Sequence, residues 1–152
     1  IAALRSAWGE RLPRYAGPHF AFDDFIIDPC SPRRRLPIWL GGRSPRSLRR
    51  ALAAGDGWDP FGLTLAEIGA LLARARDWPE WREREAPLDV ALGLPETLDL
   101  TRPGQTEAML DLVRRTREAG ATCIHVRFRS ESLDHYLEQL ERFQGELVPR
   151  LE

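Results

Sequence analysis

Four consecutive residues, Gly41, Gly42, Arg43 and Ser44, have the types and the spacing of a phosphate-binding turn. They follow a short β-favouring run, and the Ser-Pro pair that comes next is typical of a helix N-cap and first helical position. Such a junction aims free backbone N–H groups and the positive end of a helix dipole at one point. Two glycines let an anion approach without meeting a Cβ, and an arginine adds a charge-assisted contact. We expect a phosphate site here, although βα units that bind nothing need a similar turn.

Other polar or aromatic residues follow later strand-like runs. Trp58 either walls a ligand pocket or belongs to the core, and the sequence leaves both roles open. Asp59 precedes a proline and either lines that pocket or caps the turn. Arg127 contacts an anionic group or forms an internal salt bridge. For His125 we favour a hydrogen-bonded interior residue over a proton-transfer group.

We expect no metal site. The two cysteines, Cys30 and Cys123, lie far apart and have no partner at metal-ligand spacing, so they are expected to be reduced thiols. The sequence shows no Ser/His/Asp set, no metal-ligand cluster and no P-loop.

The elements that would position these residues alternate regularly. Glycine-marked and proline-marked boundaries predict short strands near 37–41, 57–61, 88–94 and 122–128. Helices are expected at 45–54 and at about 105–119, and another is expected to start at the Thr64–Glu67 capping box. The last helix should begin after Ser132 as its N-cap, and apolar residues repeat along it at helical spacing: Leu133, Tyr136, Leu137, Leu140 and Phe143. A β-α order with short connections predicts a parallel sheet covered by helices.

Strand alternation predicts what each side of this sheet meets. In the third and fourth strands, Val90, Leu92, Ile124 and Val126 share the side that helices would cover, while the residues between them are small or polar. A polar inner side suits strands that line a barrel with a site at their C-terminal ends. An open doubly wound sheet, which would be apolar on both faces, ranks second.

Residues 1–36 are expected to form a separate segment. Leu4, Ala7, Trp8 and Leu12 predict the tail of an amphipathic helix, and 15–28 an extended or hairpin excursion. A proline-bounded loop with arginines at 33–35 follows, which is either solvated or in contact with an anionic cofactor tail. We therefore divide the chain into a helix tail, hairpin and linker at 1–36 and a half-barrel at 37–152.

Length and charge limit the remaining possibilities. The chain has 152 residues, whereas a complete eightfold β/α barrel usually takes about 250. A formal net charge of −1 argues against a nucleic-acid or membrane partner bound by bulk charge, and no apolar run approaches bilayer length. We expect a cytoplasmic protein. All 22 basic residues are arginine, and Lys and Asn are absent, which suggests a GC-rich bacterial genome.

The run PIWLGGRSPRSLRRALAAGDGWDPFGLT, residues 37–64, resembles the later half of luciferase-like monooxygenases and coenzyme F-420-dependent oxidoreductases. That family carries a PIW-(V/L/I)-GG-x-S…LRRA…GDGW pattern, and both motifs occur here in the same order and with the same gap. The resemblance implies an α/β fold, namely the C-terminal half of a (β/α)8 TIM barrel. It also implies an oxidoreductase parent with an organic substrate, which the sequence does not identify.

The resemblance assigns roles to the candidate residues. It implies that Gly41 to Ser44 hold the phosphate of FMN or of coenzyme F-420, a deazaflavin. With such a cofactor, the pocket that Trp58, Asp59 and Arg127 are candidates to line would be that of the ring or of the substrate. In this family the residues that meet the reactive ring come largely from the first four strands, which we expect to be missing here. The identity of the catalytic residues and the activity of this chain alone therefore stay open, as does the choice between FMN and the deazaflavin.

Two alternatives remain. The first is a non-catalytic half-barrel that serves as a binding or assembly module. The second is an unrelated barrel enzyme whose glycine turn grips a phosphorylated metabolite. In either case a half-barrel leaves open strand edges, so we expect a homo-oligomer or pairing with the missing N-terminal half.

Overall fold

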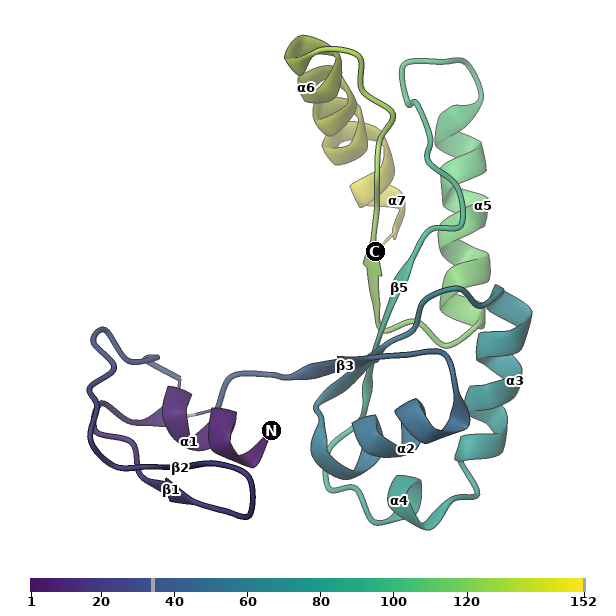
Figure 1. The fold of residues 1–152 in the computed structure, drawn as a ribbon. Helices are drawn as coiled ribbons and strands as arrows, with labels where there is room; N and C mark the ends of the chain where they lie inside the picture. Colours follow the sequence, from purple (N-terminus) through teal and green to yellow (C-terminus); the bar gives the residue numbers. More distant parts are fainter. Residues whose placement is uncertain (34, 152) are drawn as a thin grey trace.

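The computed structural model describes residues 1–33 and 35–151, and the predicted 33–35 arginine run therefore includes one position, Arg34, outside the described residues. The main body is an α/β unit in which parallel strands alternate with helices (Figure 1). The sheet has the order β3-β4-β5-β6, with all neighbours parallel. Its strands are β3 (Trp39–Gly41), β4 (Gly57–Asp59), β5 (Asp89–Gly93) and β6 (Cys123–His125).

The helices follow the strands in the expected order. They are α2 (Pro45–Ala54), α3 (Leu65–Ala75), the short α4 (Pro79–Arg82), α5 (Gln105–Glu118) and α6 (Leu133–Arg142). A π-helical turn η1 (Phe143–Leu147) and α7 (Val148–Leu151) extend α6. The predicted helix starts are confirmed: the hydroxyls of Ser44, Thr64 and Ser132 each accept a hydrogen bond from a backbone N–H three residues later.

The two sides of the sheet differ as the alternation predicts. Val90 and Leu92 are buried under the helices in a core that also contains Leu40 and residues of α2 and α3. A second core joins α5, the loop after β5 and the buried Leu147 of η1. Cys123 and His125 lie on the other side of β6 and are exposed. The helices therefore cover one side only, and the inner side of the sheet stays open.

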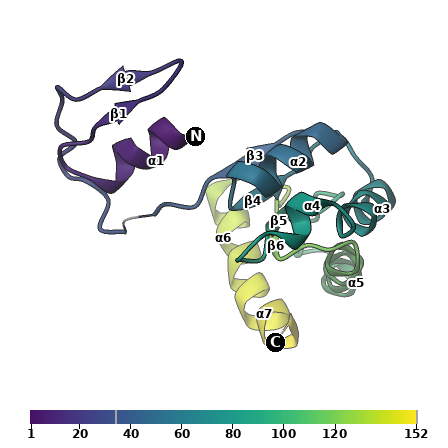
Figure 2. The same ribbon diagram turned by 90° about the horizontal axis from the view of Figure 1, so that it is seen from below.

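Residues before β3 form a smaller segment beside the sheet. Helix α1 (Ala2–Gly9) precedes an antiparallel pair, β1 (Tyr15–Ala16) and β2 (Ala21–Phe22), in agreement with the predicted helix tail and hairpin. Figure 2 shows this segment set apart from the helices that cover the sheet. Arg5 is its main link to the body, with hydrogen bonds to the carbonyl of Leu36 and to Asp56.

Asp56 binds both parts of the chain at this link. It accepts hydrogen bonds from the backbone N–H of Ile38 and from the guanidinium groups of Arg5 and Arg35. Burial alone would raise the pKa of Asp56, but these hydrogen bonds and the charge of Arg5 outweigh it and lower the pKa to about 2. The carboxylate therefore stays ionised and holds the start of β3 against the N-terminal segment.

A large surface remains exposed. The chain exposes 10295 Å², whereas a compact folded chain of its mass would expose about 7,800 Å². Part of the additional exposed area lies on α6, where the predicted helical spacing is correct. Its apolar residues nevertheless point outward, with exposed fractions between 38% and 70%: Leu133, Tyr136, Leu137 and Leu140. Within the described ranges, no helix is long and apolar enough to cross a bilayer.

Candidate functional site

The glycine turn lies at the C-terminal end of β3, directly before α2. Gly42 has a φ of 136°, a conformation that residues with a Cβ rarely adopt. A Cβ on Gly42 would also collide with the Cβ of Ser47 and come within 2.7 Å of its Oγ. The turn therefore depends on glycine at this position for both conformation and space.

Ser47 shapes the turn from inside α2, a role that the sequence analysis missed. Its hydroxyl donates to the Ser44 carbonyl at 2.8 Å and accepts from the Ser44 N–H at 3.1 Å, while the Ser44 hydroxyl accepts from the Ser47 N–H at 3.3 Å. In this reciprocal cap the Ser44 hydroxyl acts as an acceptor, and its own proton is not donated within the cap. The available signal was the Ser-x-x-Ser spacing, a variant of the capping box.

The turn offers several donors to an anion. The backbone N–H of Arg43 has no hydrogen-bond partner among the residues that the structure describes, whereas the N–H of Gly42 faces the carbonyl of Asp59 across the β3–β4 pair. Arg43 is exposed, forms no ion pair with any described residue, and its side chain passes over Gly62. Together with the N-terminus of α2, these groups surround one point with positive charge and free donors.

Trp58 is part of the core, so of its two possible roles the pocket wall is wrong. Its side chain is fully buried on the helix-covered side of β4. Alternation explains this position, because Gly57 and Asp59 face the inner side and the residue between them must face the helices. The indole Nε1 lies 3.4 Å from Ser47 Oγ, so Trp58 supports the start of α2 from beneath.

Asp59 and His125 face each other on the open inner side. Asp59 Oδ1 lies 3.9 Å from His125 Nε2, and both side chains are about half exposed. They approach across β5 because Gly93 lies between them, where a Cβ would come within 2.8 Å of the imidazole. His125 therefore lies on the inner side of the sheet, where the strand alternation places it, and its role there stays a prediction.

The same side carries Arg127 and Trp39. Arg127 is exposed and forms no salt bridge with any residue in the described ranges. Trp39 lies flat across Gly57 and donates from Nε1 to Asp89 at 3.2 Å. Sequence reasoning treated Trp39 only as a strand residue, although its alternation with Gly41 places both on the inner side.

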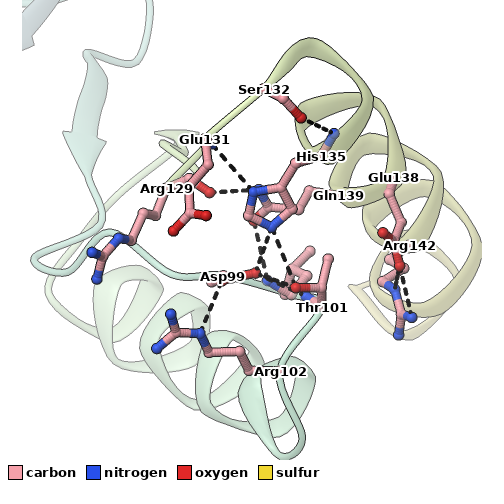
Figure 3. A network of polar contacts seen from close by, with 11 residues as sticks. Asp99, Thr101, Arg102, Arg129, Glu131, Ser132, His135, Glu138, Gln139 and Arg142 are labelled. Atoms are coloured by element: carbon pink, nitrogen blue, oxygen red, sulfur yellow. Dashed lines mark hydrogen bonds and ion pairs between the residues drawn. The ribbon is translucent and has the colours of Figure 1, made fainter.

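A polar network joins the loops that follow β5 and β6 (Figure 3). His135 Nε2 lies 3.1 Å from Asp99 Oδ1, and the Thr101 hydroxyl donates to the same oxygen at 2.6 Å. The N–H of Glu131 donates to His135 Nδ1, so both ring nitrogens have partners among the described residues. The hydrogen bond from Thr101 has the largest effect on the pKa of Asp99 and lowers it. Burial raises this pKa, the contact with His135 lowers it further, and the resulting pKa is about 2.

Gln139 completes this network and is fully buried. Its Oε1 accepts the N–H of Leu100 at 3.1 Å, and its Nε2 donates to the carbonyl of Arg129 at 2.6 Å. These contacts bind α6 to both loops. The network is a structural clasp, which no pattern in the sequence indicated.

The described residues contain no group of three or more His, Cys, Asp or Glu side chains that could hold a metal ion. The candidate site is instead the glycine turn at the C-terminal end of β3, with polar side chains on the inner side of β4 and β6. Polar groups at the C-terminal ends of parallel strands covered by helices are characteristic of α/β-barrel proteins.

Comparison with known proteins identifies the family. The model of the luciferase-like monooxygenase family matches residues 1–148, so the chain belongs to this family. The uncharacterized proteins Mb0965c of Mycobacterium bovis and Rv0940c of Mycobacterium tuberculosis are each 27% identical to it over 129 residues. These matches cover 80% of this chain and 41% of each relative. The chain thus spans about two fifths of the length of these curated relatives.

A solved structure shows the same fold. Monooxygenase RslO1 from Streptomyces bottropensis superimposes with a TM-score of 0.63 at 16% sequence identity. The match covers 98% of this chain and 59% of RslO1. The predicted fold class is therefore confirmed: the chain is an α/β unit that forms part of a β/α barrel.

Proposed function

We propose that this chain supplies the cofactor-phosphate site of a flavin- or deazaflavin-dependent luciferase-like oxidoreductase. The observation that carries the proposal is the turn at Gly42 and Arg43, where the N–H of Arg43 has no partner among the described residues and the N-terminus of α2 follows directly. Family membership supports an oxidoreductase of this kind. FMN and coenzyme F-420 both carry the phosphate that such a turn would bind.

The residues of the turn fit a phosphate group. Gly42 leaves space that a Cβ would fill, and the hydroxyl proton of Ser44 is free to be donated once its oxygen has accepted the N–H of Ser47. Arg43 is exposed, with no carboxylate among the described residues to compete for it. The Arg43 N–H, one hydroxyl and one guanidinium would satisfy several phosphate oxygens at once.

The remaining polar residues of the inner side would meet the rest of the cofactor or an organic substrate. A flavin or deazaflavin supplies hydride transfer, and a reduced flavin also activates oxygen. In this proposal the chain binds and orients the group through its phosphate. Arg127 contributes a positive charge to the inner side, and Asp59 with His125 contributes a carboxylate and an imidazole on the same surface.

Fluorescence titration tests the proposal. Flavin emission is followed while the chain is added to FMN or to riboflavin, which has the same ring but no phosphate. We expect FMN to bind at least ten-fold more tightly than riboflavin, and Arg43→Gln to remove most of that difference. Arg50→Gln, a change on the exposed side of α2, is the matched control and is expected to bind FMN normally.

Three outcomes would contradict or redirect the proposal. Equal affinity for FMN and riboflavin would exclude the turn as the phosphate site. A normal affinity in Arg43→Gln would exclude this arginine from it. Binding of a sugar phosphate without binding of FMN or coenzyme F-420 would favour an enzyme that acts on a phosphorylated metabolite.

A further inference from the structure

The loop after β4, residues 60–63, lies beside the glycine turn. Its first end is fixed by the sheet, because Asp59 is the last residue of β4 and pairs with Gly41 in the parallel register. Its second end is fixed by the capping box of α3, in which Thr64 and Glu67 exchange hydrogen bonds. The loops that follow β3 and β4 are therefore neighbours at the C-terminal edge of the sheet.

A side chain from each of these two loops lies on a glycine of the other. Arg43, from the β3 loop, passes over Gly62, and its Nη1 and Cδ lie 3.8 Å and 4.0 Å from the position that a Cβ on Gly62 would take. Phe61, from the β4 loop, lies over Gly41, with its Cε1 3.9 Å from the corresponding position. The loops therefore pack against each other at van der Waals distance, on the surfaces that the two glycines leave free of side chains.

Gly62 suits this contact in both conformation and size. Its φ is 64°, in the left-handed region that residues with a Cβ rarely adopt. A Cβ alone would only touch Arg43, but a longer side chain would compete for the space that the guanidinium group and its stem occupy. A glycine at this position is therefore what allows Arg43 to lie across the β4 loop.

The contact orders Arg43 without using its hydrogen-bond donors. Arg49, one and a half turns further along the chain, is held through its charge, by an ion pair with Glu80 and by the ring of Trp78. Arg43 forms no ion pair with any described residue, and its stem packs on Gly62 instead. Its guanidinium N–H groups therefore stay available to a ligand.

We propose that Gly62 is a positioning residue: it supports the side chain of Arg43, so that the guanidinium group is ordered beside the glycine turn before a ligand binds. This inference rests on the proposed function, in which Arg43 contacts the phosphate of the cofactor. An arginine that is ordered in advance loses less side-chain entropy on binding. The phosphate site is then built from two loops, with the contacting groups on the β3 loop and their support on the β4 loop.

Fluorescence titration with FMN and with riboflavin tests the effect on the phosphate site. The variant is Gly62→Asn, because asparagine tolerates a left-handed φ and its amide enters the space of Arg43. We expect the affinity for FMN to fall roughly three- to ten-fold, the cost of ordering one long side chain, while the affinity for riboflavin stays unchanged. Gly104→Asn is the matched control, because Gly104 also has a positive φ but a Cβ there would meet nothing within 4 Å.

A double variant shows whether the effect depends on Arg43. In an Arg43→Gln background, Gly62→Asn should cause no further loss of FMN affinity. The proposal would be overturned by a Gly62→Asn variant that binds FMN as the wild type does. An equal loss in the Arg43→Gln background, or an equal loss in Gly104→Asn, would overturn it as well.

NMR relaxation of the arginine side chains tests the proposal without any cofactor. In the ¹⁵N-labelled chain, the heteronuclear NOE of the Arg43 Nε–Hε group should be as high as that of Arg49, and Gly62→Asn should lower it. An Arg43 group that is mobile in the wild type, or equally ordered in the variant, would overturn the proposal. If the wild type binds FMN and riboflavin equally, the proposed function fails, and the NMR comparison still decides whether Gly62 orders Arg43.

Discussion

Replacing Gly42 by alanine should damage the glycine turn more than a simple loss of flexibility would. The φ of 136° is strained for any residue with a Cβ, at a cost of about 1–3 kcal/mol. The added Cβ would also collide with the Cβ of Ser47, which is fixed to the backbone of α2 and cannot rotate away. Overpacking of this kind costs a further 1–3 kcal/mol or so, and we expect a total loss of about 3 kcal/mol in the free energy of unfolding.

Substitutions at two other glycines distinguish the cost of backbone strain from the cost of a steric collision. Gly104 also has a positive φ, 78°, but a Cβ there would meet nothing within 4 Å, so Gly104→Ala should cost only about 1–2 kcal/mol. Gly145 has neither constraint and lies in the π-helical turn, so Gly145→Ala should be neutral or stabilising by up to about 1 kcal/mol. We therefore predict that the loss of stability on substitution by alanine decreases in the order Gly42, Gly104, Gly145.

Urea unfolding followed by circular dichroism measures this series. The midpoint should shift while the slope stays constant, because the surface exposed on unfolding does not change. A second substitution, Ser47→Gly, removes the obstructing Cβ and should recover about 1 kcal/mol in a double-mutant cycle with Gly42→Ala. If Gly42→Ala costs no more than Gly104→Ala, the close packing of the turn against Ser47 is wrong.

Three further changes test the contacts that hold the half-barrel together. Gln139→Met should lower the free energy of unfolding by about 2–3 kcal/mol, because two backbone groups lose their partner; an unchanged urea midpoint would refute the clasp. Asp56→Asn should cost about 2 kcal/mol at neutral pH, because the folded pKa of about 2 lies below the ordinary 3.8. That stabilisation is present above pH 4 and is lost as the pH falls from about 4 to 2. When thermal unfolding is measured across this pH range, the melting temperature of the wild type should therefore fall more steeply than that of the variant. Thr64→Ala should remove about 1 kcal/mol by breaking the cap of α3, and Thr64→Ser, which keeps the hydroxyl, should restore most of it in the same assay.

Local chemistry made much of the fold predictable. Ser44 and Thr64 mark helix starts because a capping hydroxyl acts within three residues, and the structure begins α2 and α3 directly after them. The alternation in β5 gave the helix-covered side correctly, because a strand reverses its side chains at every residue, although Ala91 on the other side is also buried. The parallel order of the four strands followed from the short βα connections.

Other features depend on contacts that periodicity does not report. The spacing in α6 indicates an apolar face but not what covers it, and here Gln139 and His135 turn that face outward. Trp58 could have been assigned to the core from the sequence, since its neighbours Gly57 and Asp59 are the small and polar residues of the inner side. The pairing of His125 with Asp59 requires the register of three strands, which no local pattern supplies.

The central claim is that the turn at Gly42 and Arg43 binds the phosphate of the cofactor. Backbone N–H chemical shifts from ¹⁵N-labelled chain test it most directly, because they locate a ligand residue by residue. With FMN or coenzyme F-420, we predict saturable shifts at Gly42, Arg43 and Ser44 that riboflavin does not produce. Shifts that spare these amides while flavin binds elsewhere, or no binding by either cofactor, would contradict the account.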